Sequence, residues 1–228
     1  MPIKICVFDA YGTLFDVGAA ARTAAAEPGR TKLAEKATEL AEFWRQKQLS
    51  YSWLRAVSGN HIDFWTVTEN GLDWALERTG LDGDVELRER LLSLYWELAA
   101  YREVPMMLAT LKAAGMKTAI LSNGEPEMLE GAVKSAGLEI YLDAVLSVED
   151  VGVFKPDPKV YQMVLDRFKC SADEVLFVSS NGWDAAAASG FGFQTAWVNR
   201  AGEPMDRLFA EPQHVLSDLT EIPKLAGL

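Results

Sequence analysis

The sequence is poor in the residues that most often bind metals or form disulfides. Its 228 residues include only two cysteines, Cys6 and Cys170, and two histidines, His61 and His214. The cysteines lack the spacing of metal ligands, and Cys6 falls in an apolar stretch, so we expect both thiols to be reduced and structural. The histidines lie far apart in the sequence, which argues against a histidine-based metal site.

Long apolar runs and an excess of positive charge are also missing. No apolar run reaches the 18 residues that would indicate a membrane-spanning helix, and no signal peptide is apparent, so we expect a cytoplasmic protein with no membrane partner. The 33 acidic residues outnumber the 22 basic ones, giving a net charge of −11, which argues against a nucleic-acid partner. A small anionic substrate would need a local cationic pocket.

A short apolar stretch near the N-terminus ends at a carboxylate. Residues 5–8 favour a strand that is buried on both faces; Asp9 follows directly, and Gly12 lets the chain turn away. In open α/β sheets, ligands bind at the carboxyl ends of strands, which makes Asp9 a candidate catalytic residue. The alternative is that Asp9 only caps the next element.

Apolar residues recur at helical spacing between residues 16 and 100. Leu33, Ala37, Leu40 and Trp44 form one such stripe, a second helix is predicted over residues 64–79 before Gly80, and leucines at 87, 91, 94 and 98 indicate a third. No strand is apparent in this interval, which contains five of the seven tryptophans. We expect an all-helical insertion and expect most of its tryptophans to pack in its core.

Strands and helices alternate after residue 101. Strands are predicted over residues 118–121, 144–147, 175–178 and 195–198, and helices over 105–115, 127–137, 158–168 and 185–189. Repeated strand–helix units imply a parallel sheet with helices on both faces. The prediction is a doubly wound α/β core of residues 1–15 and 101–228, with a helical cap of residues 16–100.

Four polar motifs follow strand ends in a characteristic order. They are Asp9 and Thr13 in DAYGT, Ser122 in ILSNG, Lys155 in FKPDP, and Asp184 in FVSSNGWD. Together with FWRQKQL at residues 43–49 and YSWLR at 51–55, they make the whole chain resemble the L-2-haloacid dehalogenase (type II) family of the haloacid dehalogenase-like hydrolases. The resemblance implies hydrolysis of an L-2-haloalkanoic acid to a D-2-hydroxy acid and halide, without a cofactor, by a homodimer.

Two positions depart from the phosphatases of that superfamily. Tyr11 stands where phosphatases carry a second aspartate that acts as acid and base, and Ser180 stands where they carry a magnesium-binding acid. Magnesium prefers several oxygen ligands, including carboxylates, and only Asp184 remains, so we expect no metal. A halide leaves without needing a proton, so the missing general acid favours dehalogenation.

The resemblance gives the motif residues roles in a two-step reaction. Asp9 attacks C2 of the substrate and forms an aspartyl ester that water then hydrolyses. Lys155 keeps Asp9 ionised, and Thr13 orients it. The alternatives are a solvated lysine before a proline and a threonine that caps a helix.

The resemblance also assigns binding of the charged groups of the substrate. Ser122, with backbone N–H groups around Asn123, binds the substrate carboxylate, as turns that open helices often bind anions. Arg45 on the cap meets the halide or the carboxylate. Ser122 could instead cap a helix, and Arg45 could lie on a solvated helix face.

The remaining implied site residues form two sets. The first set supports Lys155 and the hydrolytic water, and comprises Tyr161, Ser179 and Asp184. The second set surrounds the substrate, and comprises Ala10, Tyr11, Gln46, Leu49, Phe64, Asn181 and Trp183.

Three other functions are compatible with this fold. A hydrolase of the same type could act on fluoroacetate or another carbon–heteroatom bond, because pocket size cannot be derived from sequence. A magnesium-dependent phosphatase is disfavoured by Tyr11 and Ser180. A binding protein on the same fold would need a broken site, and every expected polar position is filled.

Overall fold

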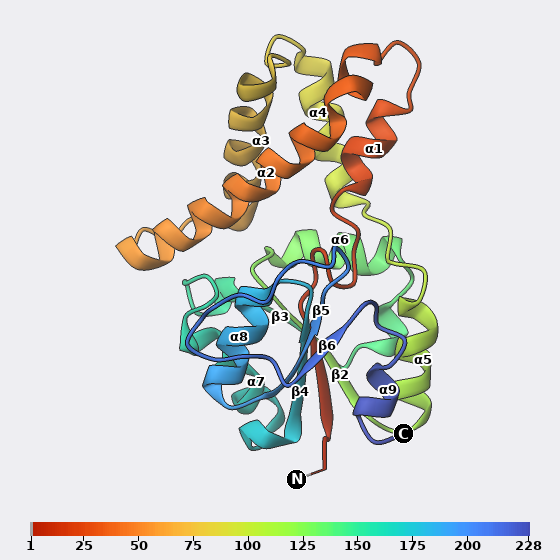
Figure 1. Ribbon diagram of the computed structural model, residues 1–228, viewed down its shortest axis with the longest axis vertical. Helices are drawn as coiled ribbons and strands as arrows, with labels where there is room; N and C mark the ends of the chain where they lie inside the picture. Colours follow the sequence, from red (N-terminus) through yellow and green to blue (C-terminus); the bar gives the residue numbers. More distant parts are fainter. Residues whose placement is uncertain (1) are drawn as a thin grey trace.

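The computed structural model describes residues 2–228 and contains a six-stranded parallel sheet (Figure 1). The strand order is β3-β2-β1-β4-β5-β6. The strands are β1 (Ile5–Phe8), β2 (Lys117–Ser122), β3 (Ala144–Ser147), β4 (Val175–Ser179), β5 (Gln194–Val198) and β6 (His214–Leu216). The predicted doubly wound α/β fold is confirmed.

The central strand β1 brings Asp9 to the edge of the sheet where the strands end. All four residues of β1 are buried, and Phe8 lies level with Ile120 of β2 and with Val178 of β4. The backbone N–H of Asp9 donates to the Val178 carbonyl at 2.9 Å. Asp9 therefore lies beside the carboxyl ends of both neighbouring strands, as the sequence predicts.

Helices cover both faces of the sheet. Figure 1 shows α7 and α8 on one side and α5 and α9 on the other. The helices of the core are α5 (Val104–Ala113), α6 (Pro126–Ser135), α7 (Pro158–Phe168), α8 (Gly182–Phe191) and α9 (Ile222–Leu225), with short 3-10 turns at Glu139–Tyr141, Val148–Asp150 and Ala172–Glu174. Proline in the first turn of α5, α6, α7 and α9 suits the helix start, where the missing N–H is not needed.

Four helices form a bundle above the carboxyl ends of the strands (Figure 1). They are α1 (Ala19–Ala25), α2 (Thr31–Ser58), α3 (Phe64–Thr79) and α4 (Val85–Trp96), and we call them the cap. Helix α3 begins where Asp63 accepts a hydrogen bond from the Thr66 N–H, and it ends at Gly80 with φ of 68°. The inserted helical cap is therefore confirmed.

The chain enters and leaves the cap through two adjacent segments. Asp16 N–H donates to the Ala99 carbonyl at 3.0 Å, and Tyr101 N–H donates to the Leu14 carbonyl at 2.9 Å. This pairing joins the cap to the core at one crossing. The predicted domain limits at residues 15/16 and 100/101 fall there, and they stay a prediction.

The structure corrects several details of the sequence-based prediction. Elements α1, β6 and α9 were not predicted, since α1 is alanine-rich without an apolar stripe and the other two are only four residues or shorter. Helix α8 starts at Gly182 rather than 185, and α4 ends before Leu98. Three of the five cap tryptophans pack in or against the core: Trp44 is buried, and Trp65 and Trp96 are half-buried. Trp53 and Trp74 are half-buried outside that cluster.

Two expectations about composition can be compared with the described chain. Both cysteines are free, and burial raises the pKa of the Cys6 thiol to about 12, which fits an inert structural thiol. No helix in residues 2–228 combines the length and the apolar character needed to cross a membrane.

Candidate active site

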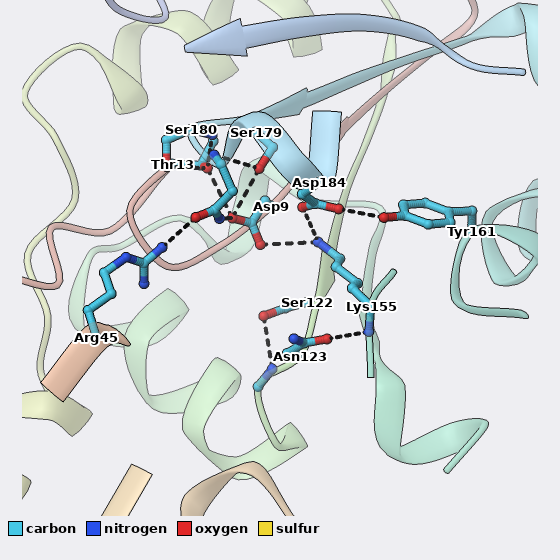
Figure 2. A network of polar contacts seen from close by, with 12 residues as sticks. Asp9, Thr13, Arg45, Ser122, Asn123, Lys155, Tyr161, Ser179, Ser180 and Asp184 are labelled. Carbon is cyan, nitrogen blue, oxygen red and sulfur yellow. Dashed lines mark hydrogen bonds and ion pairs between the residues drawn. The ribbon is translucent and has the colours of Figure 1, made fainter. Parts of the chain in front are cut away.

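Asp9 is almost buried, with 6% of its surface exposed, and its carboxylate accepts hydrogen bonds from four side chains (Figure 2). Oδ2 accepts from Thr13 Oγ1 at 3.1 Å, from Asn181 Nδ2 at 3.0 Å and from Ser179 Oγ at 3.4 Å. Within residues 2–228, Oδ1 accepts only from Lys155 Nζ, at 3.1 Å. Such donors stabilise a buried charged carboxylate.

Thr13 acts on Asp9 from the turn that follows β1. Its hydroxyl oxygen accepts a hydrogen bond from Ser180 N–H at 2.8 Å, so its proton is free to point toward Asp9 Oδ2 or Ser180 Oγ, at 3.1 and 3.2 Å. The turn is possible because Gly12 has φ of 86°, which side-chain-bearing residues rarely adopt. Thr13 therefore contacts the nucleophile candidate directly and does not merely cap a helix.

Lys155 lies between two carboxylates. Its ammonium donates to Asp9 Oδ1 at 3.1 Å and to Asp184 Oδ2 at 2.8 Å, and only 1% of the side chain is exposed. Burial alone would lower the pKa of Lys155, but the charges of Asp184 and Asp9 outweigh that effect and raise it above its usual 10.5. Lys155 is therefore a permanently charged partner of Asp9 at neutral pH, and the solvated-lysine alternative is wrong.

Asp184 and Tyr161 form a hydrogen-bonded chain that holds the ammonium of Lys155. Asp184 occupies the first turn of α8, where the helix dipole favours a negative charge, and it is fully buried. Its Oδ1 accepts from Tyr161 OH of α7 at 2.7 Å. Burial raises the pKa of Tyr161 well above 10, so the phenol keeps the proton that it donates.

The cap contributes Arg45, from the middle of α2. Its Nη2 donates to Asn181 Oδ1 at 2.7 Å, while Nδ2 of the same amide donates to Asp9 Oδ2. Arg45 is half-buried and is directed toward Asp9 in Figure 2. The cap arginine and the core carboxylate are thus joined through one side-chain amide, and the solvated-face alternative for Arg45 is wrong.

Ser122 and Asn123 form the turn after β2. Ser122 Oγ is fully buried and accepts from Gly124 N–H at 3.0 Å, and Asn123 Oδ1 accepts from Lys155 N–H at 2.9 Å. The first bond holds the turn itself and does not cap α6, because the N-cap of α6 is Glu125 and no side chain caps it, so the capping alternative for Ser122 is wrong. The second positions the loop that carries Lys155. Binding of a substrate carboxylate at this turn stays a prediction.

Aromatic rings cover the site on the cap side. Tyr11 stacks on Phe64 of α3 with ring centroids 6.2 Å apart and on Tyr95 of α4 at 5.5 Å. Within residues 2–228, the buried Tyr11 OH and Trp183 Nε1 have no hydrogen-bond partner. Buried polar atoms are seldom left unpaired in proteins, so two donors beside an apolar surface are well suited to a polar ligand.

The other predicted wall residues differ in exposure. Ala10 is fully buried beside Asp9, and Leu49 and Trp183 are half-buried, with Trp183 packed edge-on against Trp53 of α2 at 5.3 Å. Gln46 is exposed and forms no side-chain hydrogen bond within the described chain. Its place in the substrate wall stays a prediction.

Sequence reasoning gave no site role to Ser180 or Arg200. Ser180 was considered only as a missing magnesium ligand, yet its backbone and side chain both contact Thr13. Arg200 Nη2 donates to the Thr13 carbonyl at 3.1 Å from the loop after β5. An arginine in a loop of polar residues, 187 positions away, carries no local signal for this contact.

The donor set does not resemble a magnesium site. No group of three or more His, Cys, Asp or Glu side chains with metal-binding geometry occurs in residues 2–228. The two carboxylates that are present, Asp9 and Asp184, already share a cation, the ammonium of Lys155. A divalent ion at the same position would have to displace that ammonium.

Comparisons with known proteins agree with the geometry. The family model described as haloacid dehalogenase-like hydrolase matches residues 3–192. The chain belongs to this family. The chain is 48% identical to (S)-2-haloacid dehalogenase 1 of Pseudomonas sp. (strain CBS-3), over 98% of this chain and 96% of that protein. It is 44% identical to (S)-2-haloacid dehalogenase 4A of Burkholderia cepacia, over 98% and 95%.

Solved structures of this hydrolase family show the same arrangement of the chain. The L-2-haloacid dehalogenase of Xanthobacter autotrophicus, solved with chloropropionic acid covalently bound, superimposes with a TM-score of 0.86 at 39% identity, over 99% of this chain and 98% of that one. A crystal structure of a dehalogenase gives a TM-score of 0.92 at 43% identity, over 98% and 96%. The resemblance predicted from the four motifs is therefore confirmed.

Proposed function

We propose that the protein is an (S)-2-haloacid dehalogenase that hydrolyses L-2-haloalkanoic acids to D-2-hydroxy acids and halide. The observation that carries this proposal is the setting of Asp9. Its carboxylate is buried, is paired with the ammonium of Lys155 at 3.1 Å and lies below the cap arginine, with Tyr11 where an acid would be needed to protonate an alkoxide. The similarity to (S)-2-haloacid dehalogenases across the whole chain supports the same reaction.

The two oxygens of Asp9 differ in a way that selects the attacking atom. Oδ2 accepts three hydrogen bonds, whereas Oδ1 accepts one, from Lys155. Oδ1 therefore keeps a lone pair free to point at C2, and we assign it as the attacking atom. It attacks C2 in line, a carbon–oxygen bond forms, and the halide leaves with the bonding electrons toward the cap, so C2 is inverted.

The second step regenerates Asp9. Water attacks the carbonyl carbon of the Asp9 ester, and the tetrahedral oxyanion forms on Oδ2, where Thr13, Ser179 and Asn181 already donate. Donors placed in advance at a developing charge lower the barrier without further reorganisation. In the breakdown, the bond between Cγ of Asp9 and the ester oxygen breaks. That oxygen leaves on the hydroxy acid and takes one proton of the attacking water, and the second proton passes to solvent as the Asp9 carboxylate forms again.

The ester mechanism is tested by one turnover in 18O-water with enzyme in excess over L-2-chloropropionate. Label should appear in Asp9, because the water oxygen enters the side-chain carboxylate. Label found directly in lactate would contradict the ester. The variant Asp9→Asn is the matched control, since it keeps the shape of the side chain and should release no halide.

We also propose that the reaction proceeds without a metal ion. The support is the ammonium of Lys155, which occupies the position between Asp9 and Asp184 that a divalent ion would need. Halide release from L-2-chloropropionate should be unchanged in EDTA, and the D-enantiomer should not react. Release of phosphate from a phosphate ester with added magnesium would favour the phosphatase alternative.

A homodimer formed through the cap is a further part of the proposal. The C-terminal end of α2 presents Leu54 and Val57 with 65% and 90% of their surface exposed, beside a groove lined by Tyr51 and Trp74. Burial of such an apolar surface favours association. The substitution Val57→Glu should convert a dimer to a monomer in analytical ultracentrifugation.

Free thiols at Cys6 and Cys170 are compatible with the proposed cytoplasmic location.

A further inference from the structure

Two hydrogen bonds between side chains join the cap to the core within residues 2–228. One is the bond from Arg45 to Asn181 described above. The other joins His61, in the loop between α2 and α3, to Glu149, in the 3-10 turn that follows β3, with Nε2 and Oε2 3.0 Å apart. No step of the proposed reaction uses this second contact.

The contact between His61 and Glu149 is largely shielded from water. Their side chains are 22% and 24% exposed, and the remaining polar atoms, Nδ1 of His61 and Oε1 of Glu149, are buried without a hydrogen-bond partner in the described chain. The imidazole ring packs on the fully buried Phe154, with ring centroids 4.5 Å apart. A shielded and packed contact of this kind keeps one geometry better than an exposed ion pair does.

On the cap side, His61 lies next to the start of α3. Phe64 is the first residue of α3 and follows His61 after only two residues. Its ring packs on Phe154 at 6.0 Å and stacks on Tyr11 at 6.2 Å, so it covers the site beside Asp9. A change in the position of His61 would therefore be passed directly to Phe64.

On the core side, Glu149 is tied to the turn that follows β2. Its backbone N–H donates to Ser147 Oγ at 3.2 Å, and the same hydroxyl donates to the Gly124 carbonyl at 2.7 Å. Gly124 belongs to the turn with Ser122, where the substrate carboxylate is predicted to bind. Glu149 is thus a fixed point of the core to which the cap loop can be attached.

We propose that His61 and Glu149 are positioning residues that hold Phe64 and the start of α3 over the substrate. The inference rests on the proposed function, because the pocket that they shape lies above Asp9. The reacting carboxylate of Asp9 and its partner Lys155 are held within the core and do not depend on this contact. Its loss should weaken substrate binding and leave the chemical step unchanged.

Steady-state kinetics with L-2-chloropropionate tests the proposal. Either His61→Ala or Glu149→Ala removes the contact. A single intramolecular hydrogen bond changes an equilibrium constant by about fivefold, so we expect KM to rise by about that factor while kcat changes by less than about twofold. His61→Gln should keep a KM near that of the wild type, because its amide N–H can take the place of Nε2.

Asp150→Ala is the matched control for Glu149→Ala. Asp150 is exposed in the same turn and forms no side-chain hydrogen bond within the described residues, so its substitution removes the same charge and should leave KM unchanged. The double variant H61A/E149A should have the KM of either single variant, whereas two independent effects would multiply to about 25-fold. Multiplied effects, or a KM of H61A equal to that of the wild type, would overturn the positioning role.

Amide hydrogen exchange of the protein without substrate separates this inference from the proposed function. H61A should exchange faster than the wild type over residues 60–67, where the N–H groups of Thr66 and Val67 donate to Asp63, and D150A should not. Faster exchange in a protein that hydrolyses no L-2-haloacid would support the contact and reject the dehalogenase function. Equal exchange in H61A and wild type, with normal hydrolysis and an unchanged KM, would reject the contact and leave the dehalogenase function standing.

Discussion

The substitution Lys155→Met tests the charge arrangement at the centre of the molecule. The ammonium lies 3.1 Å from Asp9 Oδ1 and 2.8 Å from Asp184 Oδ2 and is 1% exposed. Removing one member of a buried ion pair costs about 3–5 kcal/mol, because the other charge stays buried without compensation. We expect K155M to lose about that much free energy of unfolding near pH 7.5, and to lose turnover because the Asp9 carboxylate no longer has its cationic partner.

The pH dependence of this loss has a definite sign. In the wild type, burial acts to lower the pKa of Lys155, but the two carboxylates raise it above 10.5, so the stabilisation is complete below pH 10.5 and is lost only as pH rises through the folded-state pKa. In K155M, a buried carboxylate takes up a proton with a pKa above its unfolded value of about 3.9. The variant then gains stability as pH falls, by up to about 1.4 kcal/mol per pH unit. The difference in free energy of unfolding between wild type and K155M should therefore be smaller at about pH 5 than near pH 7.5.

Guanidinium chloride unfolding at the two pH values measures both effects. Lys159→Met is the matched control, since Lys159 is exposed on α7 and should change stability by less than about 0.5 kcal/mol. The double variant K155M/D184N should regain more than about 1 kcal/mol, because it leaves a single buried carboxylate. The reasoning fails if K155M loses less than about 1 kcal/mol near pH 7.5, or if its deficit is equal at both pH values.

Two further substitutions test how the site is held in place. Gly12→Ala puts a Cβ 3.0 Å from Ser180 Oγ and 3.3 Å from Arg45 Nη2 at φ of 86°. Gly29→Ala has φ of 83° and open space, so both should lose about 1–2 kcal/mol of stability. Only G12A should lower kcat/KM for halide release, and equal kcat/KM would contradict a positional role of Ser180 and Arg45. Tyr161→Phe removes the 2.7 Å hydrogen bond to Asp184 and should cost about 1–3 kcal/mol in thermal or denaturant unfolding. It should also lower kcat with KM unchanged, and an unaltered kcat would count against support of Lys155 by this bond.

The elements that were predicted correctly are those with strong local signals. Strand β1 is a run of four apolar residues stopped by Asp9, and α3 begins after the capping Asp63 and ends at Gly80. Helix α8 was started too late, because its N-cap residue Asn181 forms no side-chain capping bond and its first turn is Gly-Trp-Asp. These residues are typical of a loop, and they are helical here because α8 packs on β4 and β5.

The candidate site was predictable where it follows the sheet and less so where it depends on packing between cap and core. Parallel strands bring Asp9 and Ser179 to one edge regardless of loop detail. Arg45 comes from a helix, where consecutive side chains point about 100° apart, so Gln46 points in a different direction from Arg45. Its exposure in the structure reflects this geometry. The contact from Arg200 to Thr13 depends on how the loop after β5 folds back, which no local pattern encodes.

The distribution of charge between core and cap explains why the cap is required for an anionic substrate. In the core, Asp9 and Asp184 share the single ammonium of Lys155, which leaves one unit of negative charge beside the reacting carbon. A haloacid brings a second carboxylate and then releases a halide, both of which that negative charge would repel. Arg45 adds the missing positive charge, and it arrives on a helix of the cap, joined to Asp9 only through Asn181. In the proposed reaction, the positive charge that the substrate and the leaving group require is therefore supplied across the contact between cap and core.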